Sequence, residues 1–340
     1  MKPKLVLSIF MALLLSNGIY AAGLIDISYS PYTISQSGSY IVVADITTAQ
    51  DLNCITISAN DVTIDLNGHK LYGAGTAAGT FGAGIYASPS YNNIAITNGI
   101  ICDFREDAIS AQGLNVQVSK VRTHSTGGNG INVGENAVVV NNSAYQHGYS
   151  GIAVQAGSVV RDNTATQCTF YGIYLTGVGC TVTGNSVYYN FNHGIYASSG
   201  CTIVGNNAST NSGNGIYLGG SGCSVINNTV YNNALTGIYG ASGCAIIGNC
   251  TYNNSSSGIR VYNGCEVMHN TCRYNQYAGI QVTGDANSVS QNVCTYNYTY
   301  GLLSGAGNYF EQNKLRDNTT DESLGGSTEG TGVLANVIIP

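Results

Sequence analysis

Charged residues are scarce in this sequence, and tryptophan is absent. Asp, Glu, Lys and Arg make up 8% of the 340 residues, compared with about 25% in an average soluble domain. The hydrophobic content is nevertheless 44%, so the chain does not combine low hydrophobicity with high net charge as disordered proteins do. The surface of the folded chain must therefore be covered mainly by Asn, Ser, Thr, Gly and Tyr.

An excess of positive charge is also missing. The chain has 11 Lys and Arg against 17 Asp and Glu, which gives a formal net charge of -6. Proteins that bind nucleic acid or anionic membranes carry basic patches. We therefore expect neither nucleic acid nor a membrane surface as a partner.

Long apolar runs are absent beyond Ala22. At the start of the chain, Lys2 and Lys4 precede an apolar run from Leu5 to Leu15, and the segment ends at Ala22. This layout is typical of a cleaved export signal, and a run of about 11 residues is too short to cross a bilayer. We predict a signal peptide over residues 1–22, no membrane insertion, and a secreted, periplasmic or cell-surface protein.

A Gly-Ile step recurs at a nearly constant spacing through most of the chain. The step begins at Gly84, Ala108, Gly130, Gly151, Gly172, Gly194, Gly215, Gly237, Gly258 and Gly279, and Gly301 precedes a leucine. The period is roughly 21–22 residues, which lies in the range of solenoid repeats. In a solenoid each unit buries its apolar face against its neighbours.

Each repeat contains three short segments in which apolar residues alternate with polar ones. Ile173-Tyr174-Leu175 is an example of the first segment, Cys223-Ser224-Val225-Ile226 of the second and Thr229-Val230-Tyr231 of the third. Alternation with period two indicates strands, and right-handed crossovers are strongly preferred between parallel strands. We predict an all-β fold, a right-handed single-stranded parallel β-helix with three sheets and about 11 turns, each of roughly 21–22 residues.

The ends of the chain depart from the repeat. We predict lead-in or cap strands over residues 23–60, the β-helix over 61–318, and a C-terminal cap or tail over 319–340. Such caps are expected because an exposed strand edge invites aggregation.

In a coil of this kind every repeat position becomes a column along the axis. Two columns consist of asparagine, which tolerates left-handed backbone and can hydrogen bond to the next turn. We expect the following residues to form ladders: Asn142, Asn163, Asn185, Asn206, Asn228, Asn249, Asn270, Asn292 and Asn313 in one, and Asn190, Asn211, Asn233, Asn254, Asn275, Asn297 and Asn318 in the other.

Five of the eleven cysteines form a third column, which the alternation places inside. These are Cys180, Cys201, Cys223, Cys244 and Cys265. They are expected either to pack as small hydrophobic side chains or to form disulfides between neighbouring turns. No Cys-x-x-Cys or Cys/His spacing typical of zinc occurs, so no such metal site is predicted.

Several segments resemble secreted right-handed parallel β-helix proteins of the pectin-lyase-like superfamily. The resemblance spans about residues 24–318 and rests on Pro31-Tyr32-Thr33-Ile34, Gly38-Ser39-Tyr40, the run from Val62 to His69, Asn98-Gly99-Ile100-Ile101 and the repeats. It implies the fold. The superfamily includes pectate lyases, polygalacturonases, alginate epimerases, carbohydrate-binding surface proteins and a periplasmic copper-site accessory protein, so it does not imply one activity. The paired-Asp motifs of polygalacturonases and the Asp-Pro-His run of alginate epimerases are absent.

Charged and titratable side chains gather in one part of the repeat array. The candidate catalytic residues are Asp103, Arg105, Glu106, Asp107, Arg122, His124, Tyr145 and His147, with Cys102, His124 and Tyr145 in one column. Polyuronate elimination or epimerisation needs a cation, a base and an acid, and hydrolysis needs two carboxyl groups. The alternative is a solvated polar rim. A calcium site at Asp103, Glu106 and Asp107 is left open, although no known loop spacing supports it; the cofactor is otherwise unknown.

A row of aromatic side chains is expected to point outward. Tyr174, Tyr196, Tyr217 and Tyr239 form one column that Arg260 continues. Such a row either stabilises neighbouring strands or offers a stacking platform for sugars. We predict an exported monomer that recognises a polysaccharide or glycan along its lateral face. The alternatives are a lyase or epimerase, before a hydrolase, that uses the polar patch, and a non-catalytic surface or adhesion rod.

Overall fold

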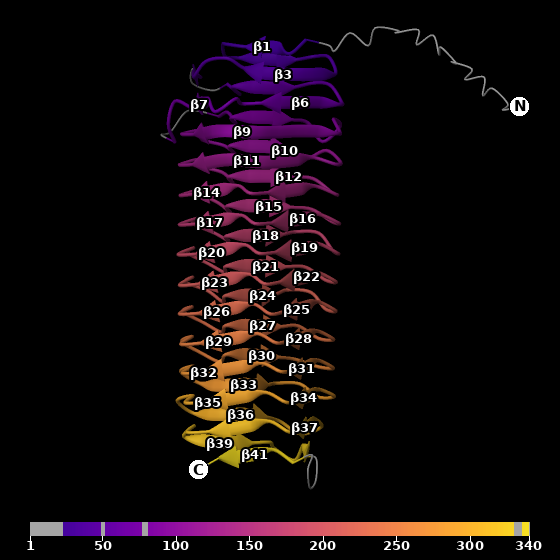
Figure 1. Cartoon of the computed structure of the whole chain (residues 1–340), viewed down its shortest axis with the longest axis vertical. Helices are drawn as coiled ribbons and strands as arrows, with labels where there is room; N and C mark the ends of the chain where they lie inside the picture. Colours follow the sequence, from indigo (N-terminus) through magenta and orange to yellow (C-terminus); the bar gives the residue numbers. More distant parts are fainter. Residues whose placement is uncertain (1–22, 49–51, 77–80, 330–334, 340) are drawn as a thin grey trace, which may run out of the picture.

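The chain folds into an elongated stack of short β-strands (Figure 1). The computed structural model describes residues 23–48, 52–76, 81–329 and 335–339. The predicted signal peptide over residues 1–22 lies outside the described residues. Within the described ranges the regular elements are all strands, and none of the described segments is a helix long and apolar enough to cross a membrane.

The strands form two parallel sheets, of which sheet B has 14 strands (Figure 1). Its strands are β2 (Tyr32–Ile34), β5 (Ile55–Ile57), β8 (Ile85–Ala87), β10 (Ile109–Ala111), β12 (Ile131–Val133), β15 (Ile152–Val154), β18 (Ile173–Leu175), β21 (Ile195–Ala197), β24 (Ile216–Leu218), β27 (Ile238–Gly240), β30 (Ile259–Val261), β33 (Ala278–Val282), β36 (Tyr300–Ser304) and β39 (Thr320–Ser323).

Sheet A has 27 strands, arranged as two stacks that share the long strands β9 (Ile94–Cys102) and β11 (Gln117–His124). The first stack also contains β1 (Ile25–Ile27), β3 (Gly38–Val42), β6 (Val62–Asp65), β13 (Val138–Val140), β16 (Val159–Arg161), β19 (Thr181–Thr183), β22 (Thr202–Val204), β25 (Ser224–Ile226), β28 (Ala245–Ile247), β31 (Glu266–Met268), β34 (Ser288–Ser290), β37 (Tyr309–Glu311) and β40 (Thr328–Glu329). The second stack also contains β4 (Ile46–Thr47), β7 (Lys70–Tyr72), β14 (Ser143–Tyr145), β17 (Thr164–Thr166), β20 (Ser186–Tyr188), β23 (Asn207–Ser209), β26 (Thr229–Tyr231), β29 (Cys250–Tyr252), β32 (Thr271–Arg273), β35 (Val293–Thr295), β38 (Lys314–Arg316) and β41 (Val337–Ile339).

The predicted columns are present as strand registers. Ile173, Ile195, Ile216 and Ile238 pair in sequence up sheet B, and all four are fully buried. Sheet B and the two stacks of sheet A form the three faces of the coil, so the predicted three-sheet parallel coil is confirmed. It has about 13 turns instead of the predicted 11, because the first turns lack the Gly-Ile step. Ile55, for example, follows a cysteine and pairs with Ile85 across a longer connection.

The strands near the N-terminus belong to the coil itself. β2 and β5, from the segment predicted as lead-in strands, pair in parallel with each other, β5 pairs with β8, and β3 pairs with β6. The parallel stacking therefore begins at β1, which pairs with β3.

Many bends of the coil share one local arrangement. A residue with positive φ turns the chain, the residue after it points inward, and where that residue is an asparagine of the ladders it bonds to the next turn. In the turn that holds β19 and β20, Gly184 has φ +67° and Tyr189 has φ +56°, and they precede Asn185 and Asn190. The Asn185 side chain donates to Asn206 Oδ1 at 2.9 Å, and the Asn190 side chain donates to Asn211 Oδ1 at 3.0 Å. Both predicted asparagine ladders are thus present.

The cysteine column occupies the third bend. All eleven cysteines are free, and the five of the column are buried. The thiol of Cys180 donates to Gln155 O at 3.1 Å, and that of Cys265 donates to Ala241 O at 3.0 Å. In the structure these cysteines therefore pack and hydrogen bond inside the coil.

Candidate functional site

Aromatic rings cover the outer face of sheet B along four consecutive strands. Tyr174, Tyr196, Tyr217 and Tyr239 come from β18, β21, β24 and β27, and the register places them directly above one another. The rings of Tyr196 and Tyr217 stack at 5.5 Å between centroids, and those of Tyr217 and Tyr239 at 4.8 Å. Each ring is half-buried, so one surface of the row faces solvent.

A second row of rings lies beside the first, at the bend that precedes the strands of sheet B. Tyr171 stacks on His193 at 5.5 Å and on Tyr196 at 5.2 Å, and His193 stacks on Tyr217 at 4.7 Å. Burial lowers the pKa of His193 to about 4 and raises that of Tyr171 to about 12. Both rings are therefore neutral near pH 7. We call the two rows together, Tyr171, Tyr174, His193, Tyr196, Tyr217 and Tyr239, the aromatic face.

Arg260 follows the aromatic face on the next strand, β30. Its guanidinium carbon lies 5.6 Å from the ring centroid of Tyr239 and 5.9 Å from that of Tyr262. Its Nε atom is buried and has no hydrogen-bond partner. A buried donor without a partner costs free energy.

The eight candidate catalytic residues do not form one site. They lie in three places: around a cavity beside sheet B, inside a bend, and on the outer face of the second stack. The spacing of the repeats predicts which residues stand at the same place on successive strands. It does not predict where the side chains of the bend at residues 103–108 point.

Glu106 and Asp107 line a cavity of about 250 Å³ together with Phe81, Tyr86 and Ser110. The guanidinium of Arg105 lies 4.3 Å from the ring centroid of Phe81. Tyr86 and Ser110 belong to β8 and β10 of sheet B, so the cavity opens beside the same sheet as the aromatic face.

Asp107 is almost completely buried and is held by hydrogen bonds. Its Oδ1 accepts from Asn129 N at 2.6 Å and from Asn129 Nδ2 at 2.9 Å, and its Oδ2 accepts from Asn132 Nδ2 at 2.9 Å. These bonds fix the turn that leads into β12. Glu106 is the exposed carboxylate of the pair.

His147 lies inside the coil. It occupies the ladder position that Cys168 and Asn190 occupy in the next two turns, and only 1% of its surface is exposed. Its Nδ1 is 2.7 Å from Thr126 Oγ1, and its Nε2 is 3.0 Å from Thr123 Oγ1. Burial lowers the pKa of His147 to about 3. The structure therefore places this histidine in the interior, at the wall of a cavity of about 400 Å³ that Thr126, Gly127 and Gln146 also line.

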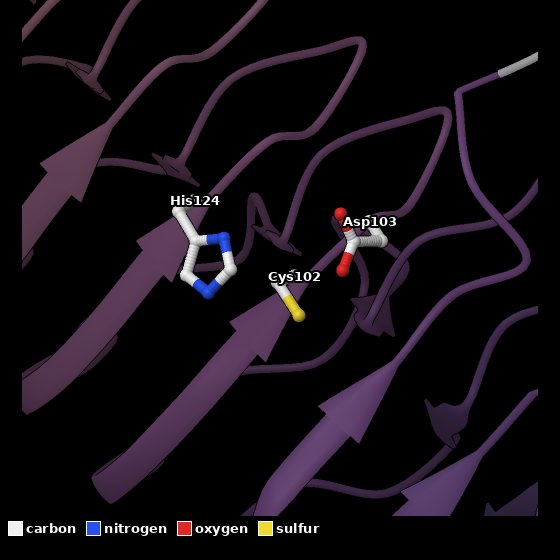
Figure 2. Close-up of side chains that lie close together, drawn as sticks. All are labelled: Cys102, Asp103 and His124. Atoms are coloured by element: carbon white, nitrogen blue, oxygen red, sulfur yellow. The ribbon is translucent and has the colours of Figure 1, made fainter.

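Arg122, His124 and Tyr145 lie on the outer face of the second stack, where His124 pairs with both Cys102 and Tyr145. Asp103 follows Cys102 at the bend, with φ +61°. One ligand atom each from Cys102, Asp103 and His124 lie within 4.8 Å of one another. Figure 2 shows the three side chains together, at the ends of two neighbouring strands.

The thiol of Cys102 is fully buried at the centre of this cluster. Burial, and then the neighbouring Asp103, raise the pKa of Cys102 to about 12, against the opposing effect of Lys70. Burial also lowers the pKa of His124. The Lys70 ammonium lies 3.9 Å from the ring centroid of Tyr72, on the strand that pairs with β9.

This cluster differs from the calcium site considered from the sequence. Among the described residues, Asp103 groups with Cys102 and His124, not with Glu106 and Asp107. Asp107 is turned toward Asn129 and Asn132, so the carboxylates do not converge. The sequence signal that locates the actual cluster is the shared column of Cys102 and His124, which stand one repeat apart.

Comparisons with known proteins agree with this architecture. A family model described as "Periplasmic copper-binding protein (NosD)" matches residues 53–239, and one described as "Right handed beta helix region" matches residues 171–320. No curated protein sequence matches the chain.

Two enzyme modules from Azotobacter vinelandii share the fold. The A-module of mannuronan C-5 epimerase AlgE6 superposes with a TM-score of 0.62 at 16% identity, covering 89% of this chain and 91% of the module. The A-module of AlgE4 superposes with a TM-score of 0.50 at 14% identity, and the match covers 87% of this chain and 91% of the module.

These matches confirm the resemblance to right-handed parallel β-helix proteins of the pectin-lyase-like superfamily. The NosD model covers more than half of the chain, and the chain therefore belongs to the NosD family.

Proposed function

We propose that this protein is an extracytoplasmic β-helix that binds an acidic polysaccharide along its aromatic face. The observation that supports the proposal most directly is the continuous row of half-buried rings on β18, β21, β24 and β27, which ends at Arg260. Aromatic rings present apolar area together with polar hydroxyl groups, and sugars offer matching C–H faces and hydroxyls.

The row has the dimensions of an extended chain of sugars. Neighbouring strands lie about 4.8 Å apart, so the rings from Tyr174 to Tyr239 cover roughly 14 Å. A ligand that lies along the coil axis would contact several rings at once. Such a surface suits a polymer better than a single small molecule.

Arg260 supports a preference for acidic sugars. Guanidinium groups pair with carboxylates through charge-assisted hydrogen bonds, and the Nε atom of Arg260 has no partner in the chain. A uronate carboxylate at this end of the row would pair with the charged guanidinium of the half-buried Arg260. The A. vinelandii modules that share the fold carry mannuronan, a polyuronate, in their names, and polyuronates are the ligand class proposed here.

An extracytoplasmic location follows from two supporting observations. Residues 1–22 have the layout of an export signal, and the family model that matches residues 53–239 is described as periplasmic. Polysaccharides of the cell envelope or the surroundings are available in such a location.

The proposal predicts that a Tyr196→Ala, Tyr217→Ala double variant binds oligouronates more weakly. Two ring contacts of about 1 kcal/mol each correspond to a roughly 30-fold loss of affinity, to be measured by titration calorimetry. The matched control is Tyr231→Ala with Tyr252→Ala, because these rings also stack, at 4.7 Å, but on the second stack. Unchanged affinity in the first variant, or an equal loss in the control, would contradict the proposal.

A lyase or epimerase is the second candidate function. The observation that favours it is the cavity lined by Glu106, Asp107 and Tyr86 beside the same sheet. In such a reaction Glu106, as the exposed carboxylate, would act as the proton-transferring group. Unsaturated products or C5-inverted uronates, formed by the protein but not by Glu106→Gln, would support this function. Binding without product formation supports recognition alone.

A further inference from the structure

We propose that Cys102, Asp103 and His124 bind one transition-metal ion of the zinc and copper group. The site lies on the outer face of the second stack, on a different sheet from the aromatic face. It is therefore independent of the polysaccharide proposal, and either can fail without the other.

The fold brings the three side chains together. Cys102 and His124 end the neighbouring strands β9 and β11, in the same column, and Asp103 follows at the bend (Figure 2). Their ligand atoms already lie within 4.8 Å of one another. Donors on one tetrahedral zinc ion, with bonds of about 2.0–2.3 Å, are roughly 3.3–3.8 Å apart. Small side-chain rotations are therefore enough to bring them onto a shared ion.

The donor set indicates the kind of ion. A thiolate selects zinc, copper(I) or iron-sulfur chemistry, and imidazole also suits zinc and copper. Zinc accepts sulfur, nitrogen and carboxylate oxygen in the same tetrahedral site, and three protein ligands leave the fourth position to water. Calcium and magnesium require oxygen ligands alone, so the buried sulfur of Cys102 excludes them.

Binding exchanges a proton for the ion. The S–H bond of Cys102 breaks, the proton passes to solvent, and the sulfur lone pair forms the bond to the metal. His124 contributes a lone pair of one ring nitrogen, and Asp103 contributes one carboxylate oxygen. No electron transfer is needed.

The other cysteines do not offer such a site. Ten of the eleven cysteines are buried, and Cys250 is the more accessible exception. Cys250 lies on β29, also in the second stack, and none of the described acids or histidines forms a three-ligand group with it. It therefore serves as a control for adventitious thiol binding.

The test is a titration of the full-length protein with Co²⁺, which substitutes for Zn²⁺ and absorbs light. We expect one ion per chain, with a thiolate-to-cobalt charge-transfer band in the near ultraviolet. Cys102→Ser should abolish the band, and Cys250→Ser should leave it unchanged. Displacement of the band by Zn²⁺ gives the zinc affinity. Circular dichroism of each variant shows whether the coil is intact.

Two further variants keep the proposal falsifiable if Cys102→Ser does not fold. His124→Gln and Asp103→Asn should each weaken Co²⁺ binding at least tenfold; Asn suits the left-handed backbone at position 103. The proposal would be overturned if the band persisted in Cys102→Ser or disappeared in Cys250→Ser. It would also be overturned if Co²⁺ bound to both His124→Gln and Asp103→Asn as tightly as to the natural chain. The absence of stoichiometric binding would overturn it as well.

A parallel titration with Cu⁺ against a chromophoric chelator distinguishes the two ions. If copper(I) is the resident ion, all three variants should weaken Cu⁺ binding, Asp103→Asn the least, because copper(I) favours soft ligands. If zinc is the resident ion, all three variants should weaken Zn²⁺ binding. If Cys102→Ser changed neither the Cu⁺ affinity nor the Zn²⁺ affinity, the proposed metal site would be contradicted.

Discussion

At many bends of the coil, two adjacent residues set the local structure. The first has positive φ, and the second points inward; where the second is polar, its side chain bonds to a neighbouring turn. Asparagine suits the second position because its amide donates and accepts. His147 occupies that position two turns below Asn190, and its ring bonds to Thr123 and Thr126. A histidine can thus replace a ladder asparagine if it remains neutral.

The buried neutral His147 predicts loss of stability in acid. Its folded pKa, about 3, lies below the unfolded value of about 6.5, so the unfolded chain binds more protons between these limits. The stabilisation is complete above about pH 6.5 and is lost as the pH falls toward 3, by about 1.4 kcal/mol per pH unit. His147→Asn should remove this component, which guanidinium unfolding at pH 7, 5.5 and 4.5 would measure.

The comparison must be made between the two proteins, because His193 also has a lowered pKa and contributes with the same sign. The free energy of unfolding of His147→Asn should decline less steeply with acidification than that of the natural chain. Parallel declines would show that His147 is not buried in the neutral form.

At the scale of elements, most strands are only three residues long and are held in place by stacking. The inward residue of each strand packs on the same position in the next turn, and the ladders fix the register between turns. In the middle of one ladder, Asn206 donates to Val182 O and Asn228 Oδ1 and accepts from the backbone and side chain of Asn185. The register thus depends on buried polar groups as well as on apolar packing.

Asn206→Ala should therefore destabilise the protein strongly. The substitution removes the acceptor of the buried Asn185 backbone N–H and the donors to the Val182 carbonyl and Asn228 Oδ1, at a cost of about 2–4 kcal/mol. Asn207→Ala is the matched control, because Asn207 is the next residue, lies on β23 and is partly exposed. Chemical denaturation of the two variants would measure the difference. Equal midpoints would contradict the role assigned to the ladder.

The element scale also explains why the turn count could not be predicted from the sequence. The Gly-Ile step marks the turns in which glycine packs against the turn above, as Gly194 does against Gly215 O. The turns built on β2 and β5 use other residues and longer connections, such as the one from Ile55 to its partner Ile85. A periodic pattern identifies the regular turns and misses the irregular ones.

For the whole molecule, the strand positions and the regularly repeated bend positions of the asparagine ladders could be predicted, and the irregular bend positions could not. The outward column from Tyr174 to Tyr239 follows from spacing alone, since one residue per turn stands at the same place on β18, β21, β24 and β27. Arg105, Glu106 and Asp107 lie between strands, where the direction of each side chain depends on local turns. Tyr171 and His193 likewise lie at a bend, directly before Gly172 and Gly194.

Column spacing also aligned Cys102 with His124, but not the carboxylate of Asp103. The bend after β9 turns Asp103 back toward the two strand ends, and only three-dimensional geometry reveals this approach. Sites made by one strand residue and one bend residue are therefore harder to predict than sites made by strand residues.

The central claim is that repeat positions become a continuous recognition surface along the coil. The most direct test is calorimetry with purified oligouronates of increasing length. Affinity should rise with each added sugar until the ligand extends from Tyr174 to Arg260, roughly 19 Å or four strand spacings, and should then level off. An affinity that is already maximal for a single sugar, or that is the same at every length, would contradict the claim.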